Sequence, residues 1–154
     1  MLDKNTFANL VECAPLISID LCVVRGGEVL MCMRENEPAK GFLFTPGGRI
    51  FKGERWSAAL SRIAITEIGL RTRDINPILM GIWDHFYENS LLAEDVSTHY
   101  VNLPHSICLE HFPALQLDEQ HNEIKWFSLG EIVDNNIFHE YMRNYASYLL
   151  KYGY

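Results

Sequence analysis

Glu67 is an acidic residue that falls on the apolar side of an expected helix. Residues 54–68 contain no helix breaker and are followed by a glycine. Helical steps from Trp56 trace a stripe that is apolar until it reaches Glu67. A buried carboxylate is costly unless an arginine, hydrogen-bond donors or a metal cation compensates its charge. Two explanations stay open for Glu67, a metal ligand or an ion pair with Arg62 or Arg49.

Asp20 is a second carboxylate in an unusual place, since it interrupts the apolar run ISIDLCVV. It is either an acid at a strand edge or turn, or a functional group. Strand alternation puts His99 on the opposite face from Tyr100. We expect three other histidines to be surface or turn residues without a function: His105, His111 and His139.

The elements that must position these residues include several strands and a few helices. Strands are expected at 16–24 and 29–34, joined by a Gly26-Gly27 hairpin turn. Further strands are expected at 75–87, 97–103 and 123–127, with a short extended segment at 41–44. Helices are expected at 5–12, at 54–68 and at 138–152, and a capping box at 128–131. This order predicts a mixed sheet with helices packed on it, an α/β or α+β fold forming one domain of residues 1–154.

The composition limits the classes of function. The 154 residues carry a net charge of −7, and the basic residues are scattered, which argues against a nucleic-acid or anionic-membrane surface. No window approaches the length of a membrane span. The four cysteines show no CxxC spacing, so we expect free thiols in a reducing, cytoplasmic compartment and no zinc site. The apolar stripe of the last helix is expected to be core or a dimer contact.

The segment around Glu67 resembles the Nudix box, a metal-binding strand-loop-helix unit of hydrolases that act on nucleoside diphosphates linked to another group. The matching residues are Gly48, Glu54, Arg62, Glu67, Gly69 and Leu70. The usual box has two further glutamates at the positions of Ile63 and Thr66. Three carboxylates can hold several cations and activate a water against phosphorus, whereas one can complete only a single magnesium site with help from other oxygens.

The loss of two glutamates is typical of one Nudix branch, the GDP-mannose mannosyl hydrolases, which the chain resembles over most of its length. The similar stretches are 15–20, 46–49, 83–87, 98–100 and 118–121. The resemblance implies a Nudix-like fold with a mixed sheet between helices, and a homodimer. It also implies hydrolysis of GDP-mannose, with GDP-glucose as a further candidate, to GDP and free hexose. Water would attack the anomeric carbon with inversion.

The resemblance also assigns site residues. It implies that magnesium, for which manganese can substitute, is held by the Gly47 carbonyl, Glu67 and Gln120. His121 would be the general base, since a neutral imidazole with an ordinary pKa of about 6.5 can accept a proton near neutral pH. The other implied roles are diphosphate binding by Arg34 and Tyr100, a leaving-group contact by Arg49, orientation of Glu67 by Arg62, and placement of Asp20 and His85 beside the sugar. Helix-end electrostatics is expected to explain Glu54.

Two other functions stay open. An ordinary Nudix pyrophosphatase would attack phosphorus and release a nucleoside monophosphate, but Ile63 and Thr66 argue against it. A non-catalytic nucleotide-sugar sensor would bind the same ligand without turnover, which the presence of Glu67 with Gln120 and His121 makes less attractive. The products released with magnesium distinguish all three.

Overall fold

Strand β1 (Leu16–Arg25) is the centre of the fold in the computed structural model, which describes residues 3–90, 96–109 and 124–154. Its first half pairs with β4 (Gly47–Arg49) and β7 (Thr98–Asn102). Its second half pairs with β8 (His105–Cys108) and β2 (Glu28–Met33). The partners change after Asp20, which lies opposite Gly47, so this carboxylate sits where the sheet divides.

The remaining strands extend the sheet on both sides of β1. β3 (Leu43–Phe44) and β9 (Ile124–Ser128) pair with β2, β6 (Trp83–Tyr87) pairs with β7, and β5 (Ile78–Leu79) pairs with β8. Parallel and antiparallel pairs both occur, so the predicted mixed sheet is confirmed.

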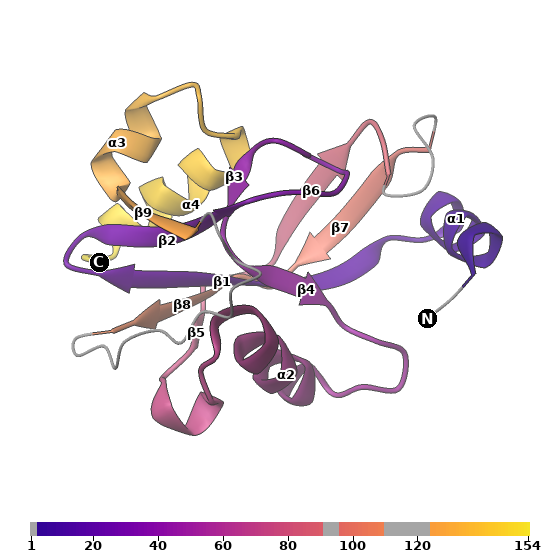
Figure 1. The fold of residues 1–154 in the computed structure, drawn as a ribbon, viewed down its shortest axis with the longest axis horizontal. Helices are drawn as coiled ribbons and strands as arrows, with labels where there is room; N and C mark the ends of the chain where they lie inside the picture. The colour runs from indigo at the N-terminus through magenta and orange to yellow at the C-terminus, as the bar shows by residue number, and fades with distance from the viewer. Residues whose placement is uncertain (1–2, 91–95, 110–123) are drawn as a thin grey trace.

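Helices cover both faces of this sheet (Figure 1). α2 (Trp56–Ile68) lies on one face, and α3 (Leu129–Asp134) and α4 (Glu140–Lys151) lie on the other. Alternate β1 residues enter two cores, Leu21 and Val23 on the α2 side and Cys22 and Val24 on the α4 side. β1 is therefore apolar on both faces. Asp20 shares the α4 side with Cys22 and Val24, because side chains alternate along a strand.

The ends of several elements follow the expected local chemistry. Gly26 and Gly27 both have positive φ, as the tight hairpin between β1 and β2 requires. α2 ends at Gly69, which has a φ of 69° and caps the last turn with its N–H. α1 (Lys4–Cys13) stops before Pro15 and packs against β7. In the described ranges, no helix is both long and apolar enough to cross a membrane.

Two strand predictions were wrong. The single strand expected at 75–87 is divided into β5 and β6, with Gly81 at a φ of +126° between them. β8 was not expected, and His105 is buried in it instead of lying on the surface. Position 123, the expected start of the last strand, and His111 lie outside the described residues.

The helices also differ from expectation at their starts. α2 begins at Trp56, and this tryptophan is 56% exposed, so it does not belong to the buried stripe. Ser128 precedes α3, but its side chain makes no capping hydrogen bond, so the predicted capping box is not formed. His139 precedes α4 and accepts a hydrogen bond from the Tyr141 N–H.

Candidate active site

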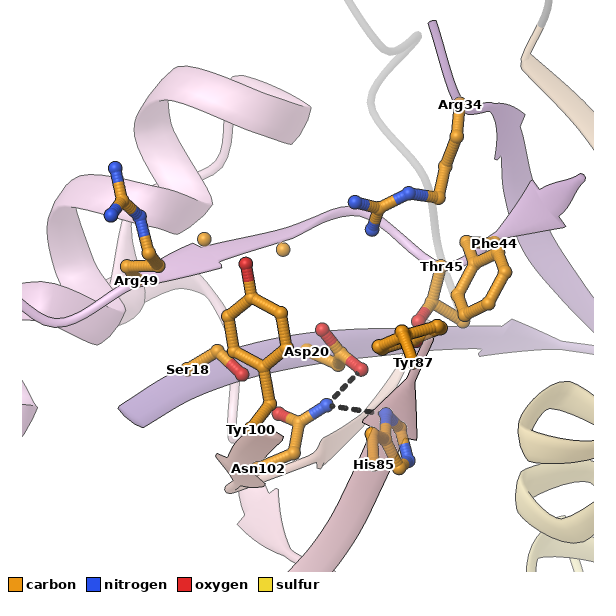
Figure 2. A pocket seen from close by; sticks show the side chains of 12 residues that line it. Ser18, Asp20, Arg34, Phe44, Thr45, Arg49, His85, Tyr87, Tyr100 and Asn102 are labelled. Atoms are coloured by element: carbon orange, nitrogen blue, oxygen red, sulfur yellow. Dashed lines mark hydrogen bonds between the residues drawn. The ribbon is translucent and has the colours of Figure 1, made fainter. Parts of the chain in front are cut away.

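A cavity opens beside Asp20, between the first half of β1 and the segment from Phe44 to Arg49 (Figure 2). Six of the ten residues proposed from the sequence line it: Asp20, Arg34, Gly47, Arg49, His85 and Tyr100. The other lining residues are Ser18, Phe44, Thr45, Gly48, Tyr87 and Asn102. Gln120 and His121 lie outside the described residues. Arg62 and Glu67 belong to α2 and are not among the lining residues.

Asp20 is held on one of its two carboxylate oxygens. Asn102 Nδ2 and the Tyr145 hydroxyl both donate to Oδ2, the hydroxyl at 3.0 Å. Burial raises the pKa of Asp20 to about 6, although these two hydrogen bonds and the charge of Arg34 act in the opposite direction. β1 has strands on both sides at this point, so the interpretation of Asp20 as an edge or turn acid was wrong.

His85 is buried on β6 against the ring of Tyr141, with the ring centroids 3.9 Å apart and the planes 3° from parallel. Its Nδ1 lies 3.4 Å from Asn102 Nδ2, and its Nε2 lies 3.3 Å from the Tyr145 hydroxyl. Burial lowers the pKa of His85 to about 4, and the charge of His139 acts in the same direction. His85 is therefore neutral at neutral pH.

The low pKa of His85 predicts a loss of stability in acid. Between pH 6.5 and about 4 the unfolded chain binds a proton at His85 that the folded chain excludes, so the free energy of unfolding falls as the pH falls. The contribution of His85 to this fall is about 2 kcal/mol between pH 7.5 and 4.5. Over the same pH interval, the free energy of unfolding of His85→Gln should therefore fall by about 2 kcal/mol less than that of the wild type. Chemical unfolding at both pH values measures the difference, and equal losses in the two proteins would contradict the buried neutral state.

Gly47 provides the space that the Asp20 carboxylate occupies. A Cβ atom at this position would lie 2.5 Å from Asp20 Oδ1 and 2.7 Å from the Ile19 carbonyl oxygen. The second contact is with backbone, which cannot turn away as a side chain can. Glycine is therefore required at this position by close packing. Backbone conformation is not the reason, because the φ of Gly47 is not in the left-handed region.

Gly47→Ala is expected to lower the free energy of unfolding by about 2 kcal/mol, because overpacked sites force the backbone to shift. Gly130→Ala is the matched control, since a Cβ atom there would meet its nearest neighbour at an ordinary 3.8 Å. Denaturant unfolding of both variants checks the prediction. A similar small change in the two would show that Gly47 has room for a side chain.

Arginines lie at both ends of the cavity (Figure 2). Arg34 follows β2, and its Nε is buried without a hydrogen-bond partner among the described residues. The Arg49 guanidinium lies over the Phe7 ring at 4.4 Å. Tyr100 lies between them, and burial raises the pKa of its hydroxyl, which therefore stays a hydrogen-bond donor. Two guanidinium groups and a hydroxyl suit an anion with several oxygens, such as a diphosphate.

Arg62 is paired with Glu54. Its Nε and Nη2 donate to the two oxygens of Glu54 at 2.9 and 2.8 Å, and Nη2 also donates to the Arg49 carbonyl at 2.8 Å. The two bonds from Arg62, together with one from the Phe51 N–H, lower the pKa of Glu54 to about 2. Glu54 precedes α2, so its interpretation as a helix-end charge was wrong, and its role is to hold Arg62.

Glu67 is half-buried on α2, the helix that packs against β4. Ile63 lies beneath Gly48, and Arg62 contacts the Arg49 carbonyl. One helical turn beyond Ile63, Glu67 therefore lies toward the Gly47 end of β4. Its charge raises the pKa of Arg62, in addition to the larger effect of Glu54, so Arg62 acts on Glu67 electrostatically. The orienting role of Arg62 stays a prediction.

The oxygen atoms of Glu67 and of the Gly47 carbonyl suit a hard cation as ligands. The Glu67 carboxylate and the Gly47 carbonyl are ligand types that magnesium prefers. Gly47 also lines the cavity beside Asp20. Within the described ranges, no group of three or more histidine, cysteine or acidic side chains is placed to hold a metal. A cation here would therefore depend on carbonyl, amide and ligand oxygens beside one carboxylate.

Asn102, Tyr87 and Tyr145 are contacts that the sequence prediction missed. Asn102 had a usable signal, since it is a polar residue two positions after Tyr100 and so faces the same way along the strand. Tyr145 had no such signal. It lies in the apolar stripe of α4, which was expected to be core or a dimer contact. Its ring is part of the hydrophobic core as expected, and its hydroxyl in addition donates to Asp20.

Comparisons with known proteins identify relatives of this arrangement. The family model of the NUDIX domain matches residues 15–148. The chain is 38% identical over 119 residues to the low-salt glycan biosynthesis protein Agl8 of Haloferax volcanii, covering 77% of this chain and 74% of that protein.

Two solved structures have a similar fold. The MutT NUDIX hydrolase from Burkholderia pseudomallei superposes with a TM-score of 0.68 at 20% identity, covering 88% of this chain and 98% of that one. The MutT protein from Methanosarcina mazei superposes with a TM-score of 0.69 at 18% identity, covering 92% and 99%. At these identities the similarity concerns the fold.

Proposed function

Because the chain belongs to the NUDIX family, we propose that it is a hydrolase that converts GDP-mannose to GDP and free mannose, with GDP-glucose as a further candidate substrate. Water attacks the anomeric carbon of the sugar, with inversion. The observation that carries this proposal is Asp20, a carboxylate that faces a cavity with an arginine at each end. The similarity to Agl8, a low-salt glycan biosynthesis protein, supports a substrate that contains a sugar.

The cavity provides separate chemistry for the two halves of such a substrate. Arg34 and Tyr100 bind the diphosphate, and Arg49 makes a further contact with the leaving group. Negative charge grows on the departing oxygen when the carbon–oxygen bond breaks, so these donors favour the transition state. Asp20 lies between the arginines, where an ionised carboxylate favours the positive charge that develops on the anomeric carbon.

Proton transfer is assigned to a residue outside the described ranges. His121 in its neutral form accepts the proton of the attacking water, the new carbon–oxygen bond forms to the sugar, and GDP leaves with the electrons of the old bond. His85 lies beside the sugar. Glu67, the Gly47 carbonyl and Gln120 would hold magnesium or manganese, which when bound adds positive charge beside the diphosphate.

Two α2 side chains support attack on carbon instead of phosphorus. Ile63 is buried in the core with 1% exposure, and Thr66 lies on the surface. Neither is a carboxylate. Glu67 is therefore the acidic side chain that α2 offers at this site. A single carboxylate is not enough to bind the several cations that would direct hydroxide at phosphorus.

Hydrolysis in oxygen-18 water with magnesium tests this function. We expect the label in mannose, unlabelled GDP, and the β anomer as the first sugar product if the water enters opposite an α-linked diphosphate. Label in phosphate, with GMP and a mannose phosphate as products, would establish the pyrophosphatase instead. Ligand binding without turnover would establish a sensor.

The proposal also covers the oligomeric state, the cellular compartment and the binding partners of the protein. We propose a homodimer in a reducing cytoplasm, with a soluble nucleotide sugar as the partner and no nucleic-acid surface. All four cysteines are free, which supports a reducing compartment. Ile17 on β1 and Phe86 on β6 are exposed apolar residues on the two strands that flank β7, which supports contact with a second copy. Analytical ultracentrifugation measures the oligomeric state.

A further inference from the structure

We propose that Asn102 is a positioning residue that, together with Tyr145, directs one oxygen of Asp20 at the substrate. The proposal deepens the proposed function and rests on it, because it assigns a second layer of residues to the sugar half of the cavity. Nothing in the sequence pattern of the Nudix box includes Asn102 or Tyr145, since one lies on β7 and the other on α4.

Four polar side chains form the floor beneath the cavity, and we call this set the polar floor: Asp20, His85, Asn102 and Tyr145. They come from β1, β6, β7 and α4, so the folded sheet and helix bring them together. Asn102 is 2% exposed, His85 2% and Tyr145 1%. Buried donors and acceptors need partners, because an unpaired one costs stability. Asn102 Nδ2 has such partners in this set, whereas Asn102 Oδ1 is buried without a hydrogen-bond partner among the described residues.

The donors and acceptors of the polar floor can be assigned from chemistry. The hydroxyl proton of Tyr145 and one N–H of Asn102 point to Oδ2 of Asp20, which only accepts when ionised. The single hydroxyl proton is then used, so His85 Nε2, 3.3 Å from this hydroxyl, must donate to it. Nδ1 of the neutral ring then carries no proton and faces the Asn102 amide nitrogen at 3.4 Å. The same amide nitrogen also donates to the Tyr145 hydroxyl at 3.0 Å.

The assignment fixes which Asp20 oxygen is available. Oδ2 has two donors beneath it, and Oδ1 turns to the space beside Gly47 that a Cβ atom would fill. Rotation of the carboxylate would remove both donors from Oδ2. Oδ1 is therefore presented in one place relative to β4 and the arginines, which is the condition for stabilising charge at a fixed carbon.

The same assignment gives His85 a supporting role. Both of its ring nitrogens face the polar floor. Nε2 donates to Tyr145, and Nδ1 lies against the Asn102 amide nitrogen, which also donates to the Tyr145 hydroxyl. One face of its ring is covered by the stacked ring of Tyr141. His85 thus has no nitrogen left for proton exchange with a substrate, and it acts as a positioning residue.

A nitrogen-15 NMR measurement of His85 tests the polar floor without using activity. We expect the neutral ring with its proton on Nε2 at pH 7.5 in the wild type. Tyr145→Phe removes the acceptor for that proton, so the Nε2–H form should lose population. Tyr148→Phe is the matched control, because this tyrosine is on the same helix and contacts Trp83 and Tyr152 instead of the floor. A proton on Nδ1 in the wild type would overturn the assignment.

Steady-state kinetics test the consequence for Asp20. Asn102→Leu and Tyr145→Phe should each lower kcat by about tenfold, with KM within about twofold, because a displaced carboxylate affects the transition state more than binding. In an Asp20→Asn background the same changes should lower kcat by less than about twofold, since residues that act through one group are not additive. Tyr148→Phe should leave kcat unchanged.

Equal losses in the wild-type and Asp20→Asn backgrounds would overturn the proposal, as would losses confined to KM. If Asn102→Leu does not fold, Tyr145→Phe carries the test, because it removes one oxygen and keeps the ring in the core. The oxygen-18 experiment on the wild type distinguishes failure of the proposed function from failure of the polar-floor proposal. Label in phosphate or no turnover would refute the proposed function, while the His85 measurement would still decide whether the polar floor exists as assigned.

Discussion

Asp20→Asn is expected to lower turnover of the GDP-sugar on the order of 10²-fold or more while making the folded protein more stable. The catalytic loss follows from removing a fixed negative charge where positive charge develops, an effect that commonly reaches 10² to 10³ in rate. The gain in folding stability follows from burial, which raises the pKa of Asp20 to about 6 and so disfavours its ionised form.

The stability gain should depend on pH. Asp20 has a raised pKa in the folded state, so its contribution to stability is present below the ordinary value of 3.8 and is lost as the pH rises through about 6. At pH 8 the asparagine variant should therefore be about 2 kcal/mol more stable, because it accepts the same two hydrogen bonds without a charge. Near pH 4 the two proteins should be similar. Urea unfolding at both pH values measures the difference.

Asp84→Asn is the control for this pair of measurements. Asp84 is exposed on β6 and pairs with His99 at 2.8 Å. Its replacement removes the same charge from the protein without touching the cavity, so turnover should stay close to that of the wild type. A mild activity loss in Asp20→Asn, equal to that of Asp84→Asn, would mean that Asp20 has no special role in the reaction.

Much of the sheet and the position of Asp20 could be predicted from sequence. The hairpin between β1 and β2 has a local cause in its two glycines, and the run around Asp20 is apolar because both sheet faces are covered. Motif resemblance identified six cavity residues that come from distant parts of the chain. The division between β5 and β6 was not visible, since it depends on a single left-handed glycine within an apolar run.

The polar floor could not be predicted, because long-range contacts determine it. Tyr145 lies 125 positions after Asp20, and its place in an amphipathic stripe gives no indication that its hydroxyl donates to a buried carboxylate. The role of Glu54 was hidden for the same reason. Its partner Arg62 is eight positions away, across a turn whose geometry brings the two side chains together. Local patterns identify unusual residues, but the partners of those residues come from the tertiary fold.

Glu67→Gln is expected to lower turnover on the order of 10²- to 10³-fold and to raise the magnesium concentration needed for half-maximal activity. Glutamine keeps the shape of the side chain but removes the negative charge that would balance a divalent cation, and metal assistance contributes several kcal/mol to such transition states. Magnesium titrations of the initial rate measure both effects. Removal of divalent cations with EDTA should bring the wild type close to the level of the variant.

Glu54→Gln provides the comparison that decides between the two explanations of Glu67. Glu54 holds Arg62 by two hydrogen bonds and is not expected to touch a cation, so its replacement should loosen Arg62 and lower turnover only modestly, without changing the magnesium requirement. Glu131→Gln, at an exposed position in the first turn of α3, should change neither quantity. A shifted magnesium requirement in Glu67→Gln alone assigns the metal to this carboxylate. Equal and mild effects of Glu67→Gln and Glu54→Gln would instead show that Glu67, like Glu54, serves to balance an arginine.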